Sequence, residues 1–147
     1  MPPSTPTELK KFLLAEGFEV YRMLGDQVVL ADRVRDNLIM DSWVTARPGP
    51  ACDVRFVIRA QARDFPGETE QQLFARARSL AEAARERGYA EVAAKRVEVP
   101  DPGDGSQTLD VWYQVTFEKS VAAEPELAGE LRYALSLEKT VPVDSQR

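Results

Sequence analysis

The sequence contains no histidine, and its 147 residues include one cysteine, Cys52. Histidine is the commonest general base and a usual catalytic metal ligand, so its absence excludes Ser-His and Cys-His catalysis and zinc sites built from histidine. One cysteine cannot form an intrachain disulfide, which is typical of a reducing compartment. The neighbouring Asp53 disfavours a thiolate. We therefore interpret Cys52 as an incidental cysteine at the start of a strand.

Several recognisable motifs are also missing. The sequence has no Walker-type phosphate loop, no dinucleotide-binding glycine pattern and no Gly-x-Ser-x-Gly elbow, so we expect no cofactor. No apolar run approaches the roughly 20 residues that span a bilayer. The N-terminal Met-Pro-Pro-Ser-Thr-Pro lacks the basic region and apolar stretch of a signal peptide. These absences predict a cytoplasmic protein with no membrane partner.

The charge of the chain is acidic and unevenly distributed. The formal net charge is −5, and the last 48 residues carry nine acidic and four basic side chains. An acidic chain repels phosphate backbones, which argues against nucleic acid as a partner. Fourteen arginines against five lysines, together with eighteen alanines, indicate a GC-rich bacterial genome.

The length and composition fit one globular domain. Hydrophobic residues make up 44% of the chain and charged residues 29%, both ordinary values. The sequence contains no internal repeat and no linker long enough to divide it. We therefore expect a single domain over 1–147, with frayed ends at 1–4 and 140–147.

Two capping boxes and a proline mark the predicted helices. Thr5 with Glu8, and Thr69 with Gln72, place a hydroxyl three residues before a side chain that can bond back to the helix start. Gly88 is suited to end the second helix. The predicted helices span 6–16, 70–87 and a last segment that begins at Pro125.

Alternating apolar and polar side chains predict six strands. The signals that separate them include Gly25-Asp26, Asp36-Asn37, the proline-rich loop 47–50 and the glycine-rich loop 100–106. An irregularity is expected near Ala93-Ala94. Val141 and Val143 could add a short edge strand. The predicted strands cover 18–24, 27–33, 38–46, 54–63, 90–99 and 109–118.

The resulting order is α-β-β-β-β-α-β-β-α. Hairpin-linked strands with few helices predict an α+β fold: one mostly antiparallel sheet with helices packed on one face. An alternative reads residues 53–143 as a β-α-β-β-α-β, ferredoxin-like unit.

Charged clusters are interpreted as structural. Arg33 and Arg35 interleave with the first aspartate group, which favours a charged hairpin turn over a metal site. The second group has turn chemistry and lacks the closing glutamate of an EF-hand calcium loop. The arginine set reads as a solvated face with glutamate partners. The aspartate groups are Asp32, Asp36 and Asp41, and Asp101, Asp104 and Asp110; the arginines are Arg55, Arg59, Arg63, Arg76, Arg78, Arg85 and Arg87.

The strand at 109–118 places a tryptophan on the side away from the core. If Val111, Tyr113, Val115 and Phe117 face inward, Trp112 lies with Gln114 and Thr116 on the opposite face. A tryptophan on a solvent-facing strand suggests burial against something. The C-terminal tail or the first helix could cover it, or it could belong to an interface. The same parity places Trp43 opposite Val44. The candidate interface residues are Trp112, Gln114, Thr116 and Trp43.

The order of elements, the size and the acidity resemble those of class I type III secretion chaperones and the related YbjN-like proteins. The resemblance covers most of the chain but rests on no motif, so it assigns no site residue. This chain has one strand more than their simple pattern. The resemblance implies a homodimer that holds a partly unfolded client along its sheet and helix surfaces.

The leading hypothesis from the sequence is therefore a non-enzymatic, dimeric escort, chaperone or adaptor for another protein. A small-molecule-binding or regulatory ferredoxin-like domain, using carboxylates and arginines in a pocket, is the first alternative. A structural subunit of a larger assembly is the second.

Overall fold

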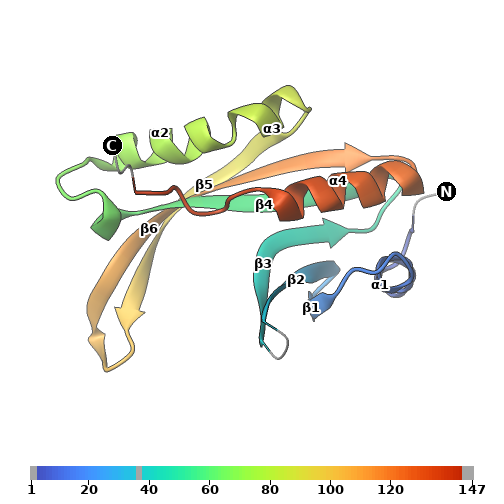
Figure 1. Ribbon diagram of the computed structural model, residues 1–147, viewed down its shortest axis with the longest axis horizontal. Coiled ribbons are helices and arrows are strands. Elements are labelled where there is room, and N and C mark those ends of the chain that lie inside the picture. Colours follow the sequence, from blue (N-terminus) through green and yellow to red (C-terminus); the bar gives the residue numbers. More distant parts are fainter. Residues whose placement is uncertain (1–2, 36–37, 144–147) are drawn as a thin grey trace. The chain divides into compact units, whose positions relative to one another are not determined.

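The computed structural model describes residues 3–35 and 38–143 (Figure 1). The predicted Asp36-Asn37 turn lies outside the described residues. The elements begin with α1 (Pro6–Ala15) and the strands β1 (Val20–Leu24), β2 (Gln27–Arg35), β3 (Leu38–Arg47) and β4 (Cys52–Gln61). A short 3-10 helix (Ala62–Asp64) precedes α2 (Glu70–Leu80) and α3 (Glu82–Glu86). The chain continues through β5 (Ala90–Asp101), β6 (Asp104–Val121) and α4 (Glu124–Ser136).

The strands form one six-stranded antiparallel sheet in the order β1-β2-β3-β4-β6-β5. The α+β class predicted from the sequence is confirmed. The first four strands follow the chain as successive neighbours, whereas β6 lies between β4 and β5. β1 and β5 are the two edges of the sheet within the described residues.

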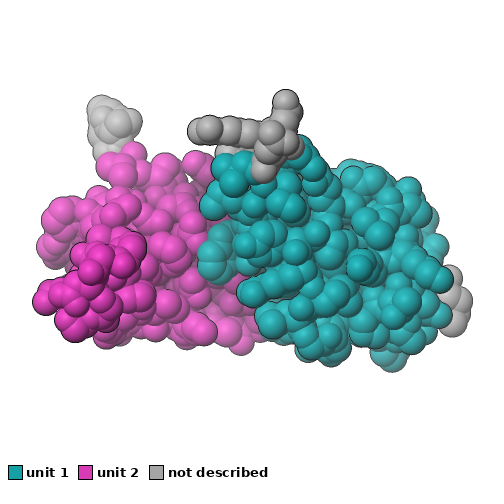
Figure 2. Space-filling model, turned by 90° about the horizontal axis from the view of Figure 1, so that it is seen from below, with its two compact units in different colours: residues 1–56, 118–137 teal, residues 57–117, 138–147 magenta. Residues whose placement is uncertain are grey.

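The chain divides into two compact units, coloured separately in Figure 2. Unit 1 comprises residues 1–56 and 118–137, and unit 2 comprises residues 57–117 and 138–147. The strands β4 and β6 each contribute residues to both units. Each unit has its own buried side chains and is described separately.

Unit 1 is built from β1, β2, β3 and the helices α1 and α4, with α1 against β1 and β2 and α4 against β3. α1 begins as predicted, because Thr5 Oγ1 accepts a hydrogen bond from the Glu8 backbone N–H at 3.1 Å. The Glu8 carboxylate accepts hydrogen bonds from the backbone N–H and the hydroxyl of Ser4. Gly17 follows the helix with a φ of 90°. The buried apolar side chains include Leu9, Leu13, Val28, Leu30, Val44, Val54, Phe56, Leu127 and Leu131.

Unit 2 contains α2 and α3 with β5 and the parts of β4 and β6 that belong to it. The capping box at Thr69 is complete, with Gln72 N–H donating to Thr69 Oγ1 and Thr69 N–H donating to Gln72 Oε1. The ring of Phe74 on α2 meets Tyr113 of β6 edge-to-face, with centroids 5.2 Å apart. The buried side chains include Ile58, Ala60, Leu73, Ala77, Ala84, Tyr89, Val115 and Phe117.

The predicted continuous helix 70–87 is two helices that break at Ala81. Ala81 N–H donates to the Arg78 carbonyl, three residues back, so the backbone tightens there and the α-helical ladder is interrupted. The strands also run further than expected. β5 and β6 continue through most of the predicted loop 100–106 and leave Pro102 and Gly103 as the turn. No helix in the described part of the chain is long and apolar enough to cross a membrane.

Candidate protein-binding surfaces

The hairpin of β2 and β3 extends beyond the rest of unit 1 as a two-stranded arm, here called the β2–β3 arm (residues 32–35 and 38–41). The pairing of β1 with β2 reaches Leu30, and the Ala31 N–H donates to the Glu19 carbonyl at 2.8 Å. The pairing of β3 with β4 covers 44–47. Between these limits β2 and β3 pair with each other, from Asp32↔Met40 to Arg35↔Leu38.

Three consecutive large apolar residues on the arm are exposed. Leu38, Ile39 and Met40 keep 43%, 40% and 51% of their surface accessible. Successive residues of a strand point to opposite faces, so both faces of the arm carry apolar side chains. Such a run on a protein surface is unfavourable in water unless a partner covers it. The run Leu38-Ile39-Met40 is visible in the sequence, where strand propensity alone accounts for it.

A bulge at the base of the arm contains Trp43. The register jumps from Val29↔Thr45 to Ala31↔Asp41, so that 42–44 on β3 oppose Leu30 alone. Trp43 has a φ of 63°, the one positive value among the described residues other than glycine. A side chain in this region costs roughly 1–2 kcal/mol. Figure 1 shows that β3 bends sharply along its length, and a bulge commonly bends its strand in this way.

Side chains on either side of Trp43 stabilise this bulge. Asp41 Oδ1 accepts the Trp43 backbone N–H at 2.7 Å. The buried hydroxyl of Ser42 donates to the Leu30 carbonyl at 2.7 Å and accepts the Val44 N–H at 3.2 Å. These bonds fix the point at which the arm leaves the sheet. Trp43, a predicted interface residue, is half-buried at this base.

The outer strand β1 adds further exposed apolar surface to unit 1. Tyr21, Met23 and Leu24 are exposed on a strand that has a neighbour, β2, on one side in the described sheet. An edge strand with apolar side chains is a template for pairing with another chain. The edge and the arm together are the most apolar exposed part of this unit.

The other predicted interface residues lie in unit 2 on β6. Trp112, Gln114 and Thr116 are half-buried, opposite the buried Tyr113 and Val115, as the alternation predicts. The alternation slips just before them, because Asp110 is buried where Val111 was expected in the core. Trp43 belongs to unit 1, so it is not grouped with these three residues.

Asp110 explains the slip, because its carboxylate collects several hydrogen bonds. It accepts the Arg63 N–H at 3.0 Å, the Val111 N–H at 2.8 Å and Trp112 Nε1 at 3.1 Å. A buried carboxylate is tolerated when such donors satisfy it. The guanidinium of Arg59 lies 4.3 Å from the centroid of the Trp112 ring, in cation–π geometry. Trp112 is therefore fixed from its edge and from one face.

The C-terminal tail binds to the same arginine. Arg59 N–H donates to the Lys139 carbonyl at 2.8 Å, and the Val141 N–H donates to the Arg59 carbonyl at 2.9 Å. Arg59 Nε also donates to Thr140 Oγ1 at 3.1 Å. The tail, one of two segments expected to cover Trp112, thus anchors the side chain that covers its ring. Thr140 of the tail forms a parallel bridge with Arg59 of β4.

A polar network connects β3, β4 and β6 in unit 1. Arg47 pairs with Asp53 at 2.7 Å, and Arg55 pairs with Glu118 at 2.6 Å. Ser120 Oγ donates to Asp53 at 2.6 Å. Burial opposes ionisation of Asp53, but the hydrogen bonds from Ser120 and Arg47 outweigh it and lower the pKa of its carboxyl. The network satisfies its own charges and is structural.

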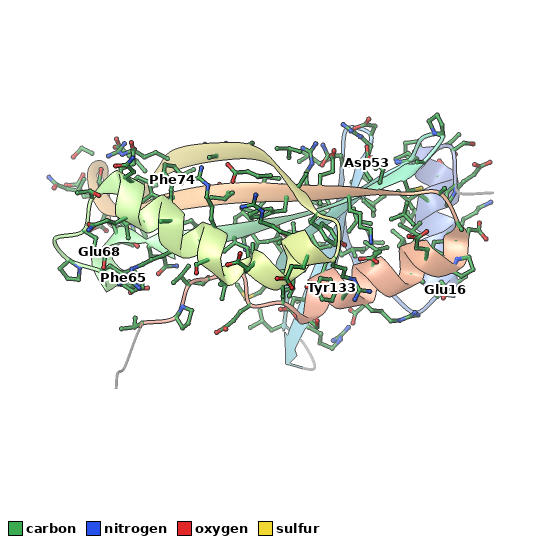
Figure 3. All side chains as sticks on the ribbon, turned by 90° about the horizontal axis from the view of Figure 1, so that it is seen from above. Glu16, Asp53, Phe65, Glu68, Phe74 and Tyr133 are labelled. Carbon is green, nitrogen blue, oxygen red and sulfur yellow. The ribbon has the colours of Figure 1, made fainter. Side chains whose placement is uncertain are left out.

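The arginines of α2 in unit 2 are also paired, as expected for a solvated face. Arg76 pairs with Glu68 at 2.6 Å and stacks on Phe65, and Figure 3 shows Glu68 and Phe65 together in the segment before α2. Arg78 pairs with Glu91 at 2.8 Å. The partners come from Glu68 and Glu91 rather than from α3. These pairs lower the pKa of both glutamates through the arginine hydrogen bonds.

Among residues 3–35 and 38–143, no group of three or more cysteine or acidic side chains lies close enough together to hold an ion. Asp101 and Asp104 accept local hydrogen bonds in the hairpin turn, while Asp36 lies outside the described residues. Cys52 is buried, its thiol donates to the Pro3 carbonyl, and burial raises its pKa.

One open groove in unit 1 has a volume of about 380 Å³. It lies between α1 and α4, with Arg132 Nη2 donating to the Glu16 carbonyl at 3.2 Å across it. Arg132 also stacks on Phe18. The groove is lined by Phe12, Glu16, Glu124, Pro125, Ala128 and Arg132.

Comparison with known proteins identified no relative of this chain. No protein-family model matches it, and no curated protein or solved structure matches it significantly.

Proposed function

We propose that this chain is a non-enzymatic protein-interaction module, a dimeric escort or adaptor for another protein in the cytoplasm. The observation that carries the proposal is the β2–β3 arm, with Leu38, Ile39 and Met40 exposed on both of its faces. A two-stranded arm of this kind gains most by inserting its apolar side chains into a complementary surface. The resemblance to secretion chaperones in element order supports the same class of function.

The arm is supported by features that make it a stable projection. The bulge at Trp43 fixes its base, and Arg33 of the arm forms a bidentate ion pair with Glu19. Little ordering is then required when a partner binds, and preorganised surfaces bind more tightly for that reason. The exposed edge of β1 extends the same apolar surface toward a second copy or a client.

The arm is tested by Ile39→Asp, with Leu109→Asp on the equally exposed β5–β6 hairpin as the matched control. Sedimentation velocity over a range of concentrations should show a dimer for the wild type and the control. Burying an apolar side chain contributes about 1.5–3 kcal/mol, so Ile39→Asp should weaken the dimer at least roughly 10-fold. A wild type that stays monomeric at high concentration, or an arm variant that dimerises equally well, would contradict the proposal.

The client is tested in the native host with tagged wild type and the same two variants. One stoichiometric partner should accompany the wild type and Leu109→Asp, and it should be lost with Ile39→Asp. Equal recovery with all three would remove the arm from the interaction. Concentration-dependent polymers instead of a closed dimer would favour a structural subunit.

The groove between α1 and α4 favours a second candidate, a small-molecule-binding domain. Arg132 and Glu16 at its rim, and Phe12 in its wall, could select a ligand with an anionic group and an apolar body. A thermal-shift screen checks this, because a ligand at 100 times its Kd stabilises by about 2.7 kcal/mol. Arg132→Ala should abolish any such shift.

A further inference from the structure

The tail of unit 2 occupies a slot that another strand could fill. The pairing of β3 with β4 ends at Phe56, and β6 is the neighbour of β4 on its other side. Further along β4, the Arg59 N–H and carbonyl both bond to the tail. Backbone hydrogen bonds of this type do not depend on the side chains of the incoming strand, so they would accept any extended segment.

Side chains give the slot a chemical preference. Arg59 Nε donates to the Thr140 hydroxyl, and the next residue, Val141, is 6% exposed. Val143, two residues further, is 58% exposed and contributes little. The tail therefore shows what the slot accepts: an extended segment with a hydroxyl residue followed by an aliphatic one.

The receiving side chains are held in place by unit 2 itself. Arg59 lies over the ring of Trp112, and Asp110 accepts the Trp112 indole N–H. Asp110 is in turn fixed by two backbone N–H groups. These contacts do not involve the tail, and a site held in place in this way is preorganised for binding.

The described contacts between the tail and β4 involve a short stretch of the tail. They include two backbone hydrogen bonds with Arg59, the Thr140 hydroxyl and the buried Val141 side chain, and Leu137 is already extended after α4 ends. A tethered segment competes with a free one through its high local concentration. A segment of a partner presented at sufficient concentration can displace it.

We propose that this slot accepts an extended segment of a client polypeptide in which a hydroxyl residue is followed by an aliphatic one. The slot consists of Arg59 on β4, Trp112 on β6 and the buried position that Val141 of the tail now fills. The chain's own tail occupies it as an internal substitute when no client is bound. The inference rests on the proposed function as an interaction module, but it uses unit 2 and not the β2–β3 arm.

The test uses the full chain and a labelled peptide with the sequence of residues 137–143, followed by fluorescence anisotropy. Val141→Asp should release the tail and increase the affinity for the peptide at least roughly 10-fold over the wild type, since the tethered competitor is removed. Val143→Asp, at the exposed position, should behave like the wild type. Circular dichroism checks that each variant is folded. If Val141→Asp does not fold, Val141→Ala replaces it in the same measurement.

The ligand provides a second control that leaves the protein unchanged. A peptide with alanine in place of the threonine and the first valine lacks both side-chain anchors, so it should bind the Val141→Asp protein at least roughly 10-fold more weakly. Equal binding of both peptides, or of the peptide to the wild type and Val141→Asp, would overturn the proposal. A wild-type dimer that dissociates in Val141→Asp would also overturn it, by assigning the slot to tail exchange between copies. The Ile39→Asp variant tests the arm, and the Val141→Asp variant tests the slot. Loss of the dimer in Ile39→Asp alone would therefore leave the peptide-binding result for the slot unaffected.

Discussion

Asp41 Oδ1 accepts a 2.7 Å hydrogen bond from the backbone N–H of Trp43, the residue that holds a φ of 63°. The bond joins the last residue of the β2–β3 arm, at the base of the arm, to the strained residue two positions further along β3. A strained conformation persists when neighbouring interactions hold it, and Asp41 and Ser42 provide them.

Asp41→Ala should lower the free energy of unfolding by about 1 kcal/mol, because the Trp43 N–H loses its acceptor. Asp41→Asn retains a carbonyl oxygen at the same place and should remain close to the wild type. Urea unfolding followed by tryptophan fluorescence measures both. If the alanine and asparagine variants are equally stable, the bond does not support the bulge.

Asp110→Ala should destabilise unit 2 by about 2–3 kcal/mol, since it leaves several donors without their acceptor in a buried position. Asp104→Ala, in the exposed hairpin turn, is the matched control and should cost less than about 1 kcal/mol. Thermal unfolding compares them. A change in the fluorescence of Trp112 in the folded Asp110 variant should accompany the loss, and an unchanged spectrum would argue that the indole is not oriented by this carboxylate.

The Asp53 carboxyl should make stability depend on pH in the acidic range. Its pKa lies below the ordinary 3.8 in the folded state, so its contribution is present above that value and is lost as the pH falls through the folded pKa. The stability advantage of the wild type over Asp53→Asn should therefore shrink progressively as the pH falls below about 5. Ser120→Ala removes one of the hydrogen bonds and should make this advantage smaller at neutral pH. A pH-independent difference would contradict the assignment.

Cys52 should be unreactive in the folded protein. Its thiol is buried and its pKa is raised, chiefly by burial, so little thiolate is present and reagents cannot reach it. Reaction with a thiol-specific chromogenic reagent should be at least about 100-fold slower in buffer than in denaturing urea. Rapid labelling without denaturant would mean that the N-terminal segment around Pro3 opens readily.

Local signals in the sequence predicted the local structure well. The box formed by Thr69 and Gln72 is present with both of its hydrogen bonds, and the alternation through Tyr113 and Val115 identified the buried side of β6. Caps and alternation depend on residues a few positions apart, so they can be read without knowledge of the rest of the chain.

The features that were missed depend on distant partners. The break at Ala81 has no glycine or proline to announce it. The burial of Asp110 in place of Val111 requires the Arg63 backbone, which is 47 residues away in the chain. The bridge between Arg59 and Thr140 joins residues 81 positions apart. The β2–β3 arm differs, because the run of Leu38, Ile39 and Met40 was visible but ordinary strand propensity explained it.

The shared strands β4 and β6 have a consequence for mapping binding sites. Unit 1 is assembled from two separate stretches of sequence, and the stretch 57–117 of unit 2 is inserted between them. No single truncation can isolate either unit, because each unit consists of two separate stretches and the boundaries at 56/57 and 117/118 cut through β4 and β6. Deletion mapping would therefore report loss of folding as loss of binding, and single surface substitutions are the appropriate way to assign each interaction to its unit.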